Sequence, residues 1–253
     1  FNTERIEHLY IEELISDLHS KMKIHLHYGN LLDPELFEEL LCKTSNMNTR
    51  HLITADGGID FSKGFQEQEF SAIPLIIAQV LYAIMLQKKG GIFIVKVFDI
   101  FSGPSVEILY LLSYFYEEVS ICKPNTSRYA NSEKYVVCQK FKFESSLDFK
   151  EKFADVLQQL SEKPESAYVH SFLGNILDIP LSFLNEIEEA NIIMGKQQMF
   201  NINSTLQYVS NKRSEKTYKL SRQNVDKCVQ WCKIHGIPIR DMYIPINIFK
   251  KKM

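Results

Sequence analysis

Three ionisable residues stand where a side chain can do chemistry rather than only face solvent. Lys96 lies inside the apolar run 91–98, where an ammonium group is costly unless a partner stabilises it. Asp56 ends a second apolar run, and Glu133 comes just before a third. A buried lysine can act as a general base when its pKa falls towards neutrality, and carboxylates can hold it in place. The alternative for each residue is a charge that reaches solvent at the edge of the core.

The elements around these residues predict an α/β fold. Through residue 98, strand and helix patterns alternate, which favours a parallel sheet with right-handed crossovers. The connection before the last strand is short, so the last two strands favour an antiparallel pair. The predicted strands are 23–28, 51–55, 91–98, 119–122 and 135–143. The predicted helices of this part are 1–21, 33–41, 71–87 and 105–115.

Glycines and polar residues predict the connections between these elements. Gly90 and Gly91 predict a tight turn before the strand that holds Lys96. The polar composition of residues 57–70 predicts a loop after Asp56. Open α/β sheets build their sites at the ends of strands, so we expect Asp56, Lys96 and Glu133 to lie close together.

Three stretches of this sequence resemble the motifs of FtsJ-like RNA ribose 2'-O-methyltransferases. They are "ADGG" with Asp56, "GGIFIVKVFD" with Lys96 and "KPNTSRYANSEKYVV" with Glu133. The resemblance is closest to eukaryotic and viral enzymes that methylate the first transcribed nucleotide of capped mRNA. It covers residues 22–145 well and residues 225–240 more weakly. It implies a Rossmann-like, S-adenosylmethionine-dependent methyltransferase fold, with a mostly parallel sheet and one reversed strand.

The resemblance also implies a Lys-Asp-Lys-Glu tetrad, of which Asp56, Lys96 and Glu133 match the last three members. In that interpretation Lys96 is the general base, Asp56 orients it near the methyl donor, and Glu133 fixes the lysine and the ribose. The first lysine and the glycine-rich cofactor loop have no match in residues 1–21. We therefore expect them upstream of Phe1, and expect residues 1–253 alone to bind S-adenosylmethionine poorly. The alternative is that the cofactor site has been lost.

The cofactor side of the resemblance rests on the turn after residue 28. Gly29 and Asn30 match a motif in which many relatives carry Gly-Asp for the adenine amino group. An asparagine can also bind adenine, but a residue that ends a strand in a turn is an equal alternative.

The RNA side of the resemblance rests on two loops. The loop before Glu133 predicts contacts to an RNA backbone, with solvated loop residues as the alternative. The loop after Asp56 carries Glu67, in the region where cap methyltransferases place a cap-contacting acid. The residues of the first loop predicted to bind RNA are Lys123, Ser127, Arg128 and Asn131.

Composition adds few constraints on function. The chain has 253 residues and a net charge of -2, so any nucleic-acid surface must be local. Five scattered cysteines predict free thiols in a reducing, intracellular compartment, either cytoplasm (including a viral factory) or nucleus. Cys228 and Cys232 favour helix packing over metal binding, so no metal is expected. The apolar stretch 73–86 is too short for a membrane span.

Residues 1–144 are therefore predicted to form the methyltransferase domain, and residues 145–253 a mainly helical extension packed on it. The predicted helices of the extension are 148–160, 181–210 and 223–233. The leading functional hypothesis is methylation of the first transcribed nucleotide of capped mRNA, from cap 0 to cap 1. The alternatives are ribose methylation of ribosomal or transfer RNA, and an inactive RNA-binding subunit. The sequence makes no prediction of the oligomeric state.

Overall fold

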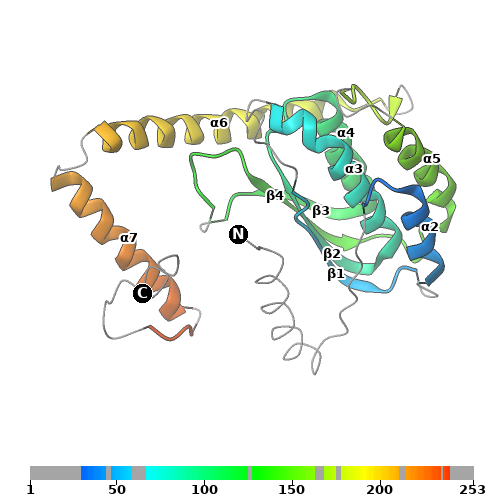
Figure 1. Ribbon diagram of the computed structural model, residues 1–253, viewed down its shortest axis with the longest axis horizontal. Helices are drawn as coiled ribbons and strands as arrows, with labels where there is room; N and C mark the ends of the chain where they lie inside the picture. Colours follow the sequence, from blue (N-terminus) through cyan, green and yellow to red (C-terminus); the bar gives the residue numbers. More distant parts are fainter. Residues whose placement is uncertain are drawn as a thin grey trace, which may run out of the picture. The chain divides into compact units, whose positions relative to one another are not determined.

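A computed structural model gives the fold of the chain (Figure 1). It describes residues 30–43, 47–58, 67–124, 127–162, 168–174, 178–210, 215–234 and 236–239. The predicted helix 1–21 and the predicted strand 23–28 lie outside these residues. The chain divides into two compact units, which are residues 1–127 with 132–191, and residues 128–131 with 192–253.

The first unit is built on a mixed sheet of four described strands in the order β1-β2-β4-β3. Strand β1 runs parallel to β2, and β4 runs antiparallel to both β2 and β3. Three strands thus point one way and one is reversed, which confirms the predicted arrangement. The bounds are β1 Arg50–Ala55, β2 Gln87–Val97, β3 Tyr116–Cys122 and β4 Lys134–Phe141.

Helix α3, Gln68–Leu86, forms the centre of the hydrophobic core. It is apolar almost all round, and by length and composition alone it could cross a membrane. Most of it is buried inside the protein, in contact with α2, α4, α5 and two strands, which accounts for its composition. Helix α2, Pro34–Lys43, begins at the predicted proline, and α4, Gly103–Phe115, follows β2.

The start of β2 differs from the prediction. Gly90 and Gly91 do not form a tight turn but lie inside the strand, which begins at Gln87. The fully buried Gln87 side chain donates to the Arg50 and His51 carbonyl oxygens at 2.6 and 3.2 Å, which ties this segment to β1. The pairing register with β1 shifts here, and Gly90 takes the irregularity with φ of +76°. The polar loop after Asp56 is also shorter than predicted, because α3 begins at Gln68.

The helices after β4 begin as part of the first unit. The 3-10 turn Leu147–Phe149 leads into α5, Lys150–Ser161, whose Leu157 is fully buried in the core. Val169 and Ile187 join the same core. Within the first unit, these residues of the extension pack against the core of the sheet domain. That residues 145–253 as a whole pack on this domain stays a prediction. The domain boundary predicted after residue 144 remains a prediction about independent folding.

The second unit contains the end of α6, Leu181–Ser210, and α7, Glu215–Ile234. Helix α7 begins earlier than the prediction of 223. Most described side chains of this unit are exposed, including large apolar ones such as Phe200 and Tyr218.

Candidate active site

Asp56 and Lys96 meet at the carboxyl edge of two parallel strands. The register pairs Ala55 with Val95, so the next residues, Asp56 and Lys96, lie side by side. The Lys96 ammonium forms a close ion pair with Asp56 Oδ1. The lysine side chain is only 18% exposed, whereas Asp56 is 64% exposed. A buried cation with an accessible carboxylate partner is therefore present where the sequence predicts it.

Helix α3 fixes the backbone that follows Asp56. The Gly57 N–H donates to Gln79 Oε1 at 3.0 Å, and Gln79 Nε2 donates to the Leu75 carbonyl oxygen at 3.0 Å. A Cβ atom on Gly57 would lie 2.8 Å from the Leu75 side chain and 3.0 Å from the Gln79 side chain, so a larger residue here would require both side chains to move. The turn that presents Asp56 is thereby held against the core.

Tyr135 lies between Glu133 and Lys96, a role that the sequence did not indicate. Tyr135 is the cross-strand partner of Lys96 between β2 and β4. Its hydroxyl donates to Glu133 Oε1 at 3.2 Å, and Ser127 Oγ donates to the same oxygen at 3.2 Å. Among the described residues no ion pair joins Glu133 directly to Lys96.

The pKa of Tyr135 reflects this position between the carboxylates. Partial burial raises the pKa, the charge of Glu133 and its hydrogen bond raise it further, and the charge of Asp56 adds a smaller effect. The tyrosine hydroxyl therefore stays protonated and remains a hydrogen-bond donor to Glu133. Asp56, Tyr135 and Glu133 thus form one electrostatic cluster around Lys96.

Lys123 brings a second cation to the same edge of the sheet. Its ammonium donates to the Glu133 carbonyl oxygen at 2.6 Å. Burial lowers the pKa of Lys123, the nearby charge of Lys134 lowers it further, and Glu133 and Asp99 partly offset the shift. Of the residues predicted to bind RNA, the structure thus places Lys123 and Ser127 beside Glu133.

The other two residues of this loop belong to the second unit. Arg128 and Asn131 lie in a turn, in which the Asn131 N–H donates to the Arg128 carbonyl oxygen at 3.2 Å. Their predicted role in RNA binding remains a prediction.

A buried ion pair lies just after β2 and just before Glu133. Lys134 is 5% exposed and pairs with Asp99 at 2.9 Å. Its ammonium also donates to the Ser132 and Phe98 carbonyl oxygens at 3.0 and 3.4 Å. These contacts join the end of β2 to the start of β4, and so hold Lys96 and Glu133 on adjoining strands. The sequence analysis missed this pair, although Asp99 and Lys134 both lie within the motifs that it used.

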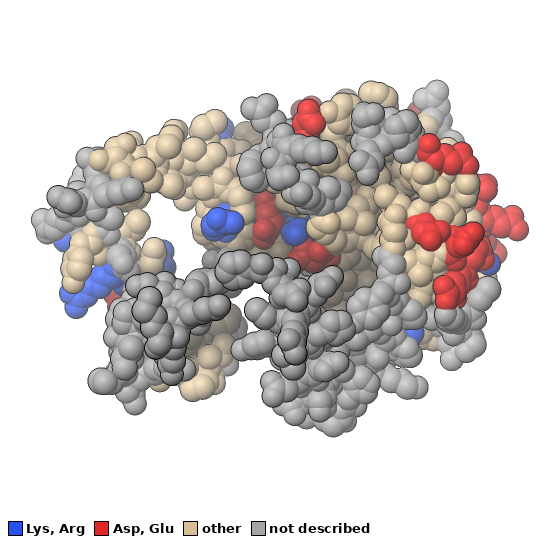
Figure 2. Space-filling model, viewed as in Figure 1, with Lys and Arg blue, Asp and Glu red and all other residues tan. Residues whose placement is uncertain are grey.

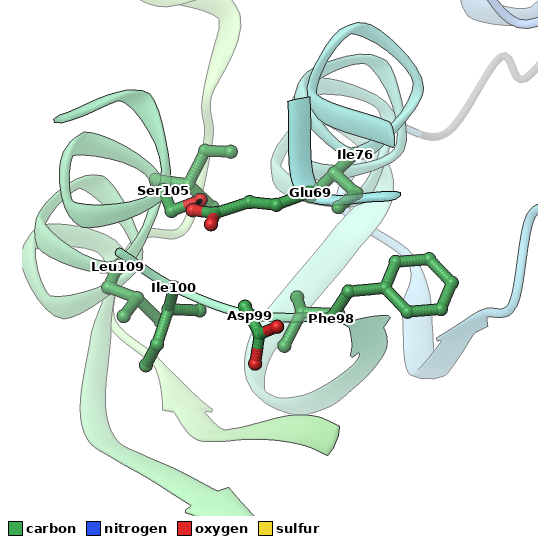
Figure 3. A pocket seen from close by; sticks show the side chains of 9 residues that line it. Glu69, Ile76, Phe98, Asp99, Ile100, Ser105 and Leu109 are labelled. Atoms are coloured by element: carbon green, nitrogen blue, oxygen red, sulfur yellow. Dashed lines mark hydrogen bonds between the residues drawn. The ribbon is translucent and has the colours of Figure 1, made fainter. Parts of the chain in front are cut away.

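The segment after β2 is held by a buried carboxylate (Figure 3). Glu69 Oε1 accepts hydrogen bonds from the Ser102 N–H and Oγ, both at 2.7 Å, and from Ser105 Oγ at 2.6 Å. These donors stand at the N-terminus of α4, where a negative charge is stabilising. Glu69, Asp99 and Ser105 line a small pocket with apolar neighbours. The hydrogen bonds of Glu69 anchor the start of α4. The residues that line the pocket do not include Asp56, Lys96 or Glu133.

Glu67 lies before α3 and contacts a tyrosine far along the chain. Local desolvation raises the pKa of Tyr168, and the charge of Glu67 and its hydrogen bond with the tyrosine raise it further. The Tyr168 ring also packs against Phe70, with 5.3 Å between the ring centroids. Both rings are partly exposed. Tyr168 was not anticipated, because it lies about 100 residues from Glu67 in the sequence.

The cofactor side is only partly described. Asn30 Oδ1 accepts the Leu32 N–H at 3.1 Å, and its carbonyl oxygen accepts the Asp33 N–H at 2.9 Å, so Asn30 serves its own turn. Gly29 lies outside the described residues. Beside Asp56, no described atom lies within 4 Å of a Cβ built on Gly58. The predicted contact of Asp56 with S-adenosylmethionine remains a prediction.

The fold and the family motifs together define an α/β domain of the Rossmann-like methyltransferase class. Residues 8–141 match the family model described as "FtsJ-like methyltransferase". The chain belongs to this family, whose methyl donor is S-adenosylmethionine.

Curated relatives carry names of cap methyltransferases. The cap-specific mRNA (nucleoside-2'-O-)-methyltransferase 2 of Drosophila melanogaster is 34% identical over 188 residues, which is 73% of this chain and 26% of the relative. The cap-specific mRNA (nucleoside-2'-O-)-methyltransferase 1 of the same fly is 28% identical over 226 residues, which is 87% of this chain and 28% of the relative. An inactive cap-specific mRNA (nucleoside-2'-O-)-methyltransferase 1B of Caenorhabditis briggsae is 28% identical over 214 residues, which is 81% of this chain and 25% of the relative. The chain spans about a quarter of the length of these relatives.

Among solved structures, human methyltransferase-like protein 13 in complex with SAH is similar with a TM-score of 0.32 and 13% identity. The alignment covers 66% of this chain and 74% of that chain. Because the TM-score is low, the fold class rests on the family match and on the sheet itself.

Proposed function

We propose that this chain is an RNA ribose 2'-O-methyltransferase that acts on the first transcribed nucleotide of capped mRNA, converting cap 0 to cap 1. The observation that carries the proposal is the ion pair between Lys96 and Asp56, linked to Glu133 through Tyr135. The names of the relatives support a capped RNA substrate and ribose methylation.

The proposed mechanism gives each group of the cluster one task. S-adenosylmethionine supplies an electrophilic methyl group when it is bound beside Asp56. Lys96, as the neutral amine, accepts the proton of the 2'-hydroxyl as the oxygen attacks the methyl group, and S-adenosylhomocysteine leaves. Asp56 orients the lysine, and Glu133, held by Tyr135 and Ser127, positions the lysine and the ribose. Lys123, beside Glu133, binds an RNA phosphate.

This proposal has two alternatives. The C. briggsae relative is named inactive, so an inactive RNA-binding subunit is the first alternative. The presence of Asp56, Lys96 and Glu133, which match three members of the family's tetrad, favours an active enzyme over this alternative. Methylation of ribosomal or transfer RNA is the second alternative, and it predicts no dependence on a cap.

The surface at Glu67 supports the choice of a capped substrate. A carboxylate can accept hydrogen bonds from the edge of a guanine, and partly exposed rings can stack on its face. Glu67 lies next to the partly exposed rings of Phe70 and Tyr168. This arrangement suits a purine base better than a bare phosphate end.

We expect faster methyl transfer to capped RNA than to triphosphate-ended RNA of the same sequence. Glu67→Ala should lower the ratio of the two rates about tenfold, because a hydrogen bond to a charged group contributes about 1.5–3 kcal/mol. Transfer to triphosphate-ended RNA should persist. The measurement is incorporation of labelled methyl groups by the full-length protein, with the exposed Glu151→Ala as the control. Equal rates of the wild-type protein on both RNAs would rule out the cap and favour the ribosomal or transfer RNA alternative.

A further inference from the structure

The net charge of the whole chain conceals a strong asymmetry between its parts. Residues 192–253 contain 12 lysines and arginines and 3 acids, for a net charge of +9. The remaining residues 1–191 contain 17 basic and 28 acidic residues, for a net charge of -11. In Figure 2, blue side chains gather over α7, whereas red side chains gather over α2 and α5. A segment this basic attracts polyanions.

Helix α7 organises part of this charge into a line. Lys219, Arg222 and Lys233 are all exposed and lie within about 60° of one another around the helix axis. From the first to the last they span about 21 Å along the helix. Asp226 is the acidic residue among them, and Lys227 follows it directly. Three cations and one acid give the line a net charge of +2, and its cations can contact the phosphates of a nucleic-acid backbone.

An exposed aromatic ring stands beside this line. Tyr218 is 71% exposed and adjoins Lys219 in the sequence. Surfaces that bind single-stranded nucleic acid without sequence preference combine cations along the backbone with aromatic rings on which bases stack. Lys219, Arg222, Lys233 and Tyr218 provide both kinds of contact.

The distribution of apolar side chains argues against a membrane surface. A helix that lies on a membrane needs one continuous apolar face. On α7, Tyr218 and the 41% exposed Trp231 are separated by about 140° around the axis. The two exposed rings therefore lie on different sides of the helix.

From these observations we propose that the second unit is a sequence-independent RNA-binding element, in which Lys219, Arg222 and Lys233 contact phosphates and Tyr218 stacks on a base. The choice of RNA over other polyanions rests on the proposed function. The contact requires neither a cap nor a methyl donor, so it can be measured independently of methyl transfer.

The test is binding of a fluorescent 20-nucleotide RNA with a 5'-hydroxyl end, measured by anisotropy without S-adenosylmethionine. The variant carries Lys219→Gln, Arg222→Gln and Lys233→Gln, and the control carries Lys88→Gln, Lys89→Gln and Lys152→Gln, three exposed lysines of the first unit. We expect the variant to bind at least about tenfold more weakly at 0.15 M salt. The slope of log affinity against log salt should fall by about 2, at about 0.7 for each lost phosphate contact. The control should bind more tightly than the variant.

A pair of variants at Tyr218 tests the stacking contact. Tyr218→Phe should bind RNA like the wild type, and Tyr218→Ala about fivefold more weakly. Circular dichroism should show unchanged helix content in all variants, because the substituted side chains are exposed.

Unchanged affinity and unchanged salt slope in the α7 variant would overturn the proposal. So would binding of phosphatidylserine vesicles, lost in the variant, with no binding of RNA. Because the RNA has no cap and no methyl donor is present, failure here would leave the proposed methylation intact. Conversely, RNA binding lost in the variant would support this proposal even if the protein transferred no methyl group.

Discussion

Replacing Lys96 with methionine is expected to abolish methyl transfer while leaving the fold and the affinity for RNA nearly unchanged. Methionine has a similar length and suits a site that is 18% exposed, so the strand should keep its packing. What disappears is the group proposed to accept the proton of the hydroxyl. Loss of a general base typically lowers the rate about 10²–10⁴-fold. The measurement is single-turnover methyl transfer to capped RNA by the full-length protein.

The matched control for this variant is Lys88→Met, which changes an exposed lysine on the same strand. It should retain nearly all activity. Asp56→Asn should lose methyl transfer as well, because the amide no longer holds the ammonium by charge. A Lys96→Met protein with more than half of the wild-type rate would show that another residue is the base.

Asp99→Ala is expected to cause the largest loss of stability of any single change around the site. It leaves the ammonium of Lys134, only 5% exposed, with two carbonyl oxygens and no counter-charge. Removing one partner of a buried ion pair costs about 3–5 kcal/mol, and the partial exposure of Asp99 favours the lower end. In a protein of this size that corresponds to a melting temperature lower by about 6–12 °C. Thermal unfolding followed by circular dichroism measures it.

Two further variants separate this effect from a general loss of charge. Glu38→Ala breaks the more exposed pair with Lys150 and should cost less than about 1 kcal/mol. Combining Asp99→Leu with Lys134→Met removes both charges and should recover much of the loss. If Asp99→Ala melted within about 2 °C of the wild type, Lys134 would have to be solvated, contrary to its burial.

Sequence reasoning predicted the strand edge where Asp56 and Lys96 meet, because both residues stand in a clear local pattern. The apolar runs that end at Asp56 and surround Lys96 predict two strands, and parallel strands place their ends at one edge. The reversed strand was also accessible, because the connection before it is short.

The contacts that support this edge were not accessible in the same way. The Gly57 N–H donates to Gln79, 22 positions away, and the Ser102 N–H donates to Glu69, 33 positions away. No local sequence pattern marks either hydrogen bond. Gly90 shows a related limit. A glycine pair indicates a turn, yet the buried Gln87 extends the strand through it, because a buried amide must find hydrogen-bond partners.

Tyr135 illustrates why the site was incomplete on sequence evidence. Its alternation along β4 predicts a strand residue, and only the pairing register places it opposite Lys96. The Tyr135 hydroxyl donates a hydrogen bond to Glu133. The sequence analysis had instead assigned Glu133 directly to Lys96.

The most direct test of the central claim is methyl transfer to two capped RNAs that differ only in the first transcribed nucleotide. One carries a free 2'-hydroxyl there, and the other already carries a 2'-O-methyl group. With labelled S-adenosylmethionine and the full-length protein, we expect label in the first RNA and only background in the second. Equal labelling of both RNAs would contradict the assignment of the site around Lys96 to this ribose.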